Sequence, residues 1–241
     1  MRHKSKFLLT ALVAMLGFTA SLIDFSTIDI ELPSFINDML YQESISAEEF
    51  ADIPDYDGEN VVVKVNQNRP DFTEEELSLS NGYWQKFSDL DHLNRVGIAE
   101  AMLHRELMPI EDRGNISNVY PTGWNQKKLA DGRWLYNRSH SIGHQMTGED
   151  ANWKNLFTGT QQLNQIYMVQ YENEVANYLR QTNNHVRYRV TPLFRDQELL
   201  PRAVQMEAQS VENDELGFNI IIHNVQDGVS IDYRTGVARE Q

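Results

Sequence analysis

Residues 135–172 read LYNRSHSIGHQMTGEDANWKNLFTGTQQLNQIYMVQYE, and this stretch decides the fold. His140 comes just after an aromatic run, and a neutral imidazole can accept a proton from water near neutral pH. Asn155 and Asn164 follow on a segment that we interpret as helix, and Glu172 comes eight residues after Asn164. An asparagine carbonyl is a hard oxygen ligand that suits Mg²⁺, an ion that keeps several of its waters. The stretch therefore offers one candidate base and one candidate metal ligand.

Several short motifs along the chain resemble those of the DNA/RNA non-specific endonuclease family. They are NRSH at 137–140, KNL at 154–156, TGT and LNQ within 158–165, PTGW at 121–124, HVRYRVTPLF at 185–194 and IDYRTG at 231–236. The resemblance covers most of residues 60–236 and is strongest to the secreted and membrane-anchored DNases of Gram-positive bacteria, where NRSH-like variants occur. Members share a ββα-metal motif and a DRGH signature. This chain departs from that signature at Asn137, which stands where the family has Asp.

The resemblance implies a role for each of four residues. His140 would act as the general base, with its other ring nitrogen held by a backbone carbonyl. Asn164 would be the only direct protein ligand of Mg²⁺, for which Mn²⁺ can substitute. Asn155 would help to orient the site, and Glu172 would hydrogen-bond a water of the metal.

Each of these residues also has a purely structural interpretation. The candidate base would then be a structural histidine, and Asn164 an exposed helical residue or a helix C-cap. Asn155 would be a turn residue that bonds its own backbone, and Glu172 a solvated helix charge.

Two arginines are candidates for binding phosphate. If residues 133–140 form a strand, Arg138 and His140 share one face, because side chains alternate along a strand. The planar guanidinium of Arg138 suits phosphoryl oxygens and could stabilise charge that develops on the phosphate. Arg113, in the charge-rich loop EDRGN at 111–115, is a second and weaker candidate.

Charge is distributed unevenly along this acidic chain, whose net charge is −14. Phosphate contacts normally come from Lys and Arg, so the overall balance is unusual for a protein that binds nucleic acid. However, residues 113–210 carry a net charge of +3, whereas residues 24–112 carry −16. The chain has no cysteine, which excludes disulfides, thiolate metal sites and a cysteine nucleophile.

The N-terminal part of the chain indicates export. Residues 1–23 combine a basic start, RHKSK, with an uncharged apolar run, which predicts a signal peptide or a short membrane anchor rather than a buried core helix. Residues 24–57 contain ten acids and no Lys or Arg, and we interpret them as an acidic spacer, with a pro-segment or docking peptide as the alternative. Residues 58–241 would form the nuclease domain, on the outside of the cell or on its surface.

The remaining patterns predict an α+β fold of the ββα-metal nuclease type, with a central antiparallel sheet and flanking helices. Strands are expected at 60–66 and 133–140, and the resemblance favours a strand over a helix at 95–104. Helices are expected near 153–166 and 167–182. Alternating patterns predict a C-terminal antiparallel meander, with strands at 185–194, 203–211, 218–225 and 229–233.

Two functions from different classes fit these features. The first is an exported, Mg²⁺-dependent endonuclease that cuts DNA, with RNA left open as a second substrate, and with little sequence preference. The second is a cell-surface module on the same fold that has lost catalysis and binds nucleic acid or a protein. The presence of His140, Asn164 and Glu172 together favours the first.

Overall fold

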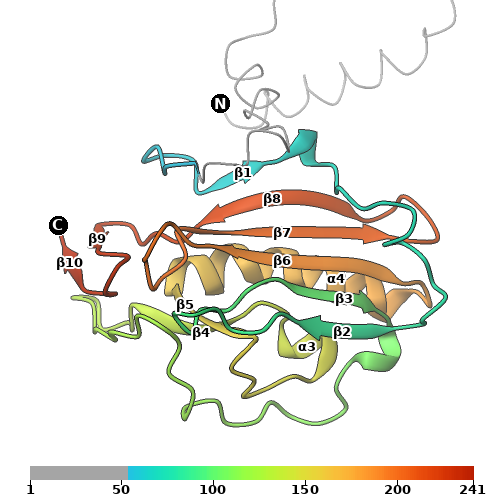
Figure 1. The fold of residues 1–241 in the computed structure, drawn as a ribbon, viewed down its shortest axis with the longest axis horizontal. Helices are drawn as coiled ribbons and strands as arrows, with labels where there is room; N and C mark the ends of the chain where they lie inside the picture. The colour runs from blue at the N-terminus through green and yellow to red at the C-terminus, as the bar shows by residue number, and fades with distance from the viewer. Residues whose placement is uncertain (1–53) are drawn as a thin grey trace, which may run out of the picture. The chain divides into compact units, whose positions relative to one another are not determined.

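The structure, a computed structural model, describes residues 54–241. The predicted signal peptide or anchor at 1–23, and all but the last four residues of the predicted spacer at 24–57, lie outside the described residues. Among residues 54–241, no helix is long and apolar enough to span a membrane. The described part is an α+β fold built on a six-stranded antiparallel sheet, as predicted (Figure 1).

The central sheet has the strand order β1-β8-β7-β6-β3-β2, and every neighbouring pair is antiparallel. Its strands are β1 (Val62–Lys64), β2 (Trp84–Phe87), β3 (Ala99–Leu103), β6 (Val186–Leu193), β7 (Ala203–Ser210) and β8 (Gly217–His223). The predicted meander is confirmed for β6, β7 and β8. The predicted strand at 229–233 lies outside this sheet, because β9 (Val229–Ile231) pairs only with β10 (Ala238–Glu240).

The main hydrophobic core lies between this sheet and the helix α4 (Val169–Gln181), which runs behind it in Figure 1. Side chains at alternate positions of β6, among them Tyr188 and Val190, face this core, as the two-residue period of a strand requires. From the helix, Val175 and Leu179 pack into the same core, and four residues separate them, so they lie on one helical face.

A two-stranded unit carries the stretch with which the sequence analysis began. β4 (Tyr136–His140) pairs antiparallel with β5 (Leu156–Thr160), and a π-helical segment (Leu163–Met168) then leads directly into α4. The strand expected at 133–140 is confirmed, and the succession of strand, strand and helix is the ββα unit. The helix expected at 153–166 is wrong over its first part, because residues 156–160 form β5.

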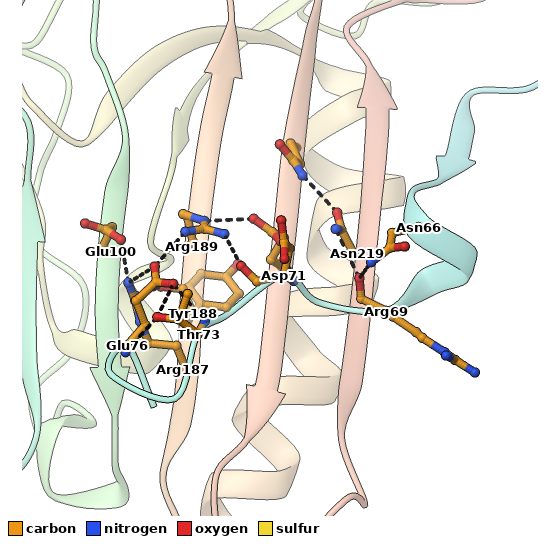
Figure 2. A network of polar contacts seen from close by, with 12 residues as sticks. Asn66, Arg69, Asp71, Thr73, Glu76, Glu100, Arg187, Tyr188, Arg189 and Asn219 are labelled. Carbon is orange, nitrogen blue, oxygen red and sulfur yellow. Dashed lines mark hydrogen bonds and ion pairs between the residues drawn. The ribbon is translucent and has the colours of Figure 1, made fainter. Parts of the chain in front are cut away.

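The opposite face of the central sheet carries charged side chains that the segment around residues 66–84 covers. Figure 2 shows Arg187 and Arg189 of β6 on this face, with Glu76 between them. Arg189 lies 2.9 Å from Glu76 and 2.8 Å from Glu207, and Arg187 forms an ion pair with Glu100. These two arginines are therefore held by carboxylates, on the face of the sheet that points away from α4.

Candidate active site

His140 is the last residue of β4, and both of its ring nitrogens have a partner. Nε2 lies 3.0 Å from the backbone oxygen of Asp150, and Nδ1 lies 3.2 Å from Nη2 of Arg113. A carbonyl oxygen only accepts and a guanidinium only donates. The proton of the neutral ring is therefore on Nε2, and Nδ1 carries the free electron pair. The predicted backbone carbonyl that fixes the tautomer is that of Asp150.

The surroundings of His140 keep its ring neutral. Burial, together with the positive charge of Arg113, lowers the pKa of His140 to about 4, although the bond to the Asp150 carbonyl acts in the opposite direction. The side chain is buried, with 6% of its surface exposed, yet it lines a cavity. A neutral imidazole with its electron pair on Nδ1 can accept a proton at neutral pH.

Asn155 fastens the backbone that follows His140. Its Oδ1 accepts a hydrogen bond from the backbone N–H of Ile142 at 2.8 Å, and its Nδ2 donates one to the Ile142 oxygen at 3.0 Å. The backbone N–H of Ser141 donates to the Asn155 oxygen at 2.8 Å. Asn155 is fully buried and directly precedes β5, so its amide orients the loop after His140 and is not exposed to the cavity.

Asp150 connects His140 to the loop that carries Arg113. Its Oδ2 accepts a hydrogen bond from the backbone N–H of Gly114 at 2.9 Å, while its backbone oxygen accepts from His140. A Cβ at Gly114 would lie 2.5 Å from this same Oδ2, so a side chain at this position would have to displace the Asp150 carboxylate. The residue was missed from the sequence, because its contact with the histidine is made by a backbone atom that any residue has.

The central cavity, of about 400 Å³, brings five of the six predicted site residues together. They are Arg113, Arg138, His140, Asn164 and Glu172, and the sixth, Asn155, lies behind the loop. The Asn164 amide and the Glu172 carboxylate make no hydrogen bond to another residue of 54–241. Two oxygen-bearing groups are thus free to face a ligand beside the base.

This donor set fits a hard, hydrated cation. Within residues 54–241 no group of three or more His, Cys, Asp or Glu side chains could enclose a metal ion. A cation in the central cavity would therefore depend on the Asn164 oxygen, on waters and on Glu172 nearby. Mg²⁺ is usually bound in this way, with few protein ligands and several retained waters.

Glu172 lies on the first turn of α4, and its carboxylate lies against Gly143 in the wall of the central cavity. Burial raises the pKa of its carboxyl group to about 7, and the charge of Arg113 opposes this rise. A Cβ at Gly143 would lie only 3.1 Å from the carboxyl carbon and from Oε1. Gly143 has an ordinary extended backbone, so a side chain there would act on the space for the carboxylate and not on the backbone angle.

The family model of the DNA/RNA non-specific endonucleases matches residues 77–212, more than half of the chain. The chain belongs to this family. It is therefore an endonuclease, a hydrolase that acts on nucleic acid, and the matched residues include the whole central cavity.

Solved structures of nucleases share the fold of this endonuclease. One is NucA from Streptococcus agalactiae with a magnesium ion bound, whose sequence is 28% identical to this chain. The superposition has a TM-score of 0.67 and includes 75% of this chain and 87% of the NucA chain. The metal-free structure of the same NucA is 26% identical with a TM-score of 0.68, covering 88% and 98% of the two chains. Sda1 nuclease with a bound zinc ion is 23% identical in sequence, with a TM-score of 0.58 over 66% of this chain and 81% of the Sda1 chain. These similarities confirm the predicted ββα-metal fold class.

The two predicted phosphate-binding arginines of this nuclease have different surroundings. Arg113 projects from its loop onto His140 and lines the central cavity. Arg138 also lines this cavity, but its guanidinium donates to the backbone oxygens of Val119 and of Ser117, the latter at 2.9 Å. Arg113 is therefore the candidate that contacts the base directly, whereas Arg138 is held by the 117–119 backbone.

Proposed function

We propose that this chain is an exported, Mg²⁺-dependent endonuclease that hydrolyses phosphodiester bonds of DNA with little sequence preference, with RNA left open as a second substrate. The observation that carries the proposal is the placement of His140, whose Nε2 is held by the Asp150 carbonyl and whose Nδ1 is unprotonated, in a cavity that also holds Asn164 and Glu172. The NucA structure with bound magnesium supports the choice of metal. The basic and apolar residues 1–23 support export.

In the proposed reaction, Nδ1 of His140 takes a proton from the attacking water, and Nε2–H stays bonded to the Asp150 carbonyl. Asn164 would hold Mg²⁺, with the Glu172 carboxylate fixing its waters. When bound, the metal supplies positive charge for the phosphate and for the leaving 3′ oxygen. Arg113 and Arg138 would hold the phosphate in the cavity, and the products would carry 5′ phosphates.

Arg113 must release Nδ1 of His140 before a water can occupy that position. The distance of 3.2 Å describes the free protein, where Arg113 bonds the base directly. An incoming phosphate offers the guanidinium a charged acceptor, and such bonds are roughly twice as strong as neutral ones. We therefore propose that substrate binding itself exposes the electron pair of His140.

Plasmid nicking as a function of metal tests this proposal. Wild-type protein should relax supercoiled plasmid with Mg²⁺ or Mn²⁺ and should stop when EDTA is in excess. Asn164→Ala should need much more Mg²⁺ to reach half of its maximal rate, because it lacks the direct ligand. Undiminished cutting in EDTA, or an unchanged Mg²⁺ dependence in Asn164→Ala, would overturn the metal assignment.

A further inference from the structure

A second cavity opens directly beside the central one, and both aromatic and polar side chains line it. We call it the aromatic groove; its volume is about 580 Å³, and Tyr120, Trp124 and Trp134 line it. It shares Arg138 and Asn164 with the central cavity, so a nucleic-acid strand bound in the central cavity can extend into the aromatic groove.

The rings of the aromatic groove are exposed to an unusual degree. Four tyrosine or tryptophan side chains are largely exposed within residues 54–241, and two of them line this groove. Tyr120 is 60% exposed and Trp134 is 55% exposed. Exposed aromatic surface beside a catalytic cavity usually marks a binding site rather than a core.

Cations accompany each ring. The guanidinium of Arg138 lies 4.3 Å from the ring centre of Trp124 and 5.2 Å from that of Tyr120. The ammonium of Lys128 lies 5.5 Å from the ring centre of Trp134. Aromatic faces combined with positive charges are the arrangement with which proteins hold single-stranded nucleic acid, since bases stack on the rings and phosphates bind the cations.

Hydrogen bonds hold the groove in shape without a ligand. Lys128 and Trp134 face each other across a β-bridge, so their side chains are placed by backbone bonds. Below them, the Gln126 amide accepts from the backbone N–H of Tyr136 at 3.0 Å and donates to its oxygen at 2.6 Å. The backbone that carries Trp134 is therefore ordered before substrate arrives, which lowers the entropy cost of stacking on its ring.

We propose that the aromatic groove binds unpaired bases next to the scissile phosphate, so that the preferred substrate is a single strand or an unpaired stretch of nucleic acid. This inference rests on the proposed nuclease function. A paired and stacked base hides its faces, so a duplex must unstack locally before a base can reach Trp134 or Tyr120. Stacking reads no base edge, so the groove is compatible with loose sequence preference.

Binding by fluorescence anisotropy tests the groove apart from catalysis. The probes are a fluorescein-labelled ten-nucleotide single strand and a blunt-ended duplex that contains the same strand, each mixed with the full-length His140→Ala protein and Mg²⁺. Trp134→Ala and Tyr120→Ala, added to this background, should each raise Kd for the single strand by about 5-fold to 100-fold, the effect expected for losing one stacked base. The Kd for the duplex should change much less.

Two matched variants control this test. Trp134→Phe keeps an aromatic face and should recover most of the affinity, which a general folding defect would not allow. Tyr83→Ala removes another exposed ring, which stacks on His104 and lines neither cavity, and should leave Kd unchanged. The proposed role of the groove would be wrong if both Trp134→Ala and Tyr120→Ala bound the single strand with unchanged Kd. It would also be wrong if Kd rose equally for the single strand and the duplex. Wild-type protein that fails to cut any plasmid would overturn the nuclease mechanism instead. The binding measurement would still show whether the groove binds unpaired bases.

Discussion

The guanidinium of Arg113 lies 3.2 Å from Nδ1 of His140, on the one ring nitrogen that can accept a proton. Its charge lowers the pKa of His140, and it also opposes the rise of the Glu172 pKa. One arginine therefore keeps the candidate base neutral and the nearby carboxyl group closer to its ionised form. Both effects extend to lower pH the range in which His140 is neutral and Glu172 is ionised.

Removing the charge of Arg113 should narrow the active pH range from the acid side. Without that charge, the pKa of His140 rises from about 4 towards its ordinary value, and the pKa of Glu172 rises above about 7. The base is then protonated, and the carboxylate neutral, at higher pH. The acid limb of kcat/KM for Arg113→Ala should move to higher pH, measured by initial nicking rates between pH 4 and 9.

Arg113→Lys is the matched control for this pH shift, because it keeps the charge and loses only the fork geometry. It should lower the rate but leave the acid limb near its wild-type position. An acid limb that stays in place in Arg113→Ala, or moves to lower pH, would show that Arg113 does not tune these groups.

Asn155→Ala should damage the site through its loop and not through the metal. The variant leaves the backbone N–H and oxygen of Ile142 without their partners, at a cost of about 1–3 kcal/mol in the free energy of unfolding. A shift of the His140 ring by about 1 Å should slow cleavage by roughly tenfold to a hundredfold. The Mg²⁺ concentration for half-maximal rate should stay as in wild type, in contrast with Asn164→Ala. A large change in that concentration, without loss of stability, would make Asn155 a ligand.

Gly143→Ala should lower activity because the new Cβ would contact the Glu172 carboxylate, at 3.1 Å. The backbone at this position suits any residue, so the free energy of unfolding should change little. Gly217→Ala is the control, since a Cβ there meets nothing closer than 3.8 Å and lies away from the cavity. Steady-state rates and thermal unfolding of both variants measure the effect. Equal activity of the two variants would mean that the Glu172 carboxylate tolerates a Cβ at position 143.

The acidic segment before the domain should be dispensable for catalysis, with a boundary near Pro54. The Tyr56 ring centre lies 5.4 Å from that of His223, and Asp55 lies 2.9 Å from Arg195, so both residues contact the folded part. A protein that begins at Pro54 should cut as fast as one that begins at Asp24, or faster at low salt, because it lacks the eight acids of residues 24–53, whose negative charge repels DNA.

Starting at Gly58 instead should leave activity intact but lower Tm by roughly 2–8 °C, as expected for about 1–2 kcal/mol in a domain of this size. Thermal unfolding of the three proteins separates the two effects. A well-folded protein starting at Pro54 that has lost most of its activity would place the acidic segment in the site.

The sequence predicted β4 and its histidine because alternation and the NRSH motif are local signals. β5 was assigned to a helix, since its short run mixes polar and apolar residues and no local period separates the two states. What makes it a strand is its pairing with β4: a Cβ at Gly159 would lie 2.2 Å from Oγ of Ser139, so glycine allows the close approach. Such cross-strand contacts depend on residues far apart along the chain.

The site was predictable to a similar extent. His140, Asn164 and Glu172 came from the family motifs, and the structure brings all three to one cavity. The partner of Nδ1 was not predictable, because Arg113 reaches it from a loop 27 residues away. The aromatic groove is not predictable for the same reason: the strand expected at 133–140 includes Trp134, but only the structure shows that this ring is exposed.

The most direct test of the account compares plasmid nicking by wild type and His140→Ala at saturating Mg²⁺. If His140 is the base, the variant should be slower by about 10²-fold to 10⁴-fold, the usual contribution of a positioned proton acceptor, while it still binds the labelled single strand. A folded His140→Ala protein that nicks plasmid within a few-fold of the wild-type rate would contradict the central claim.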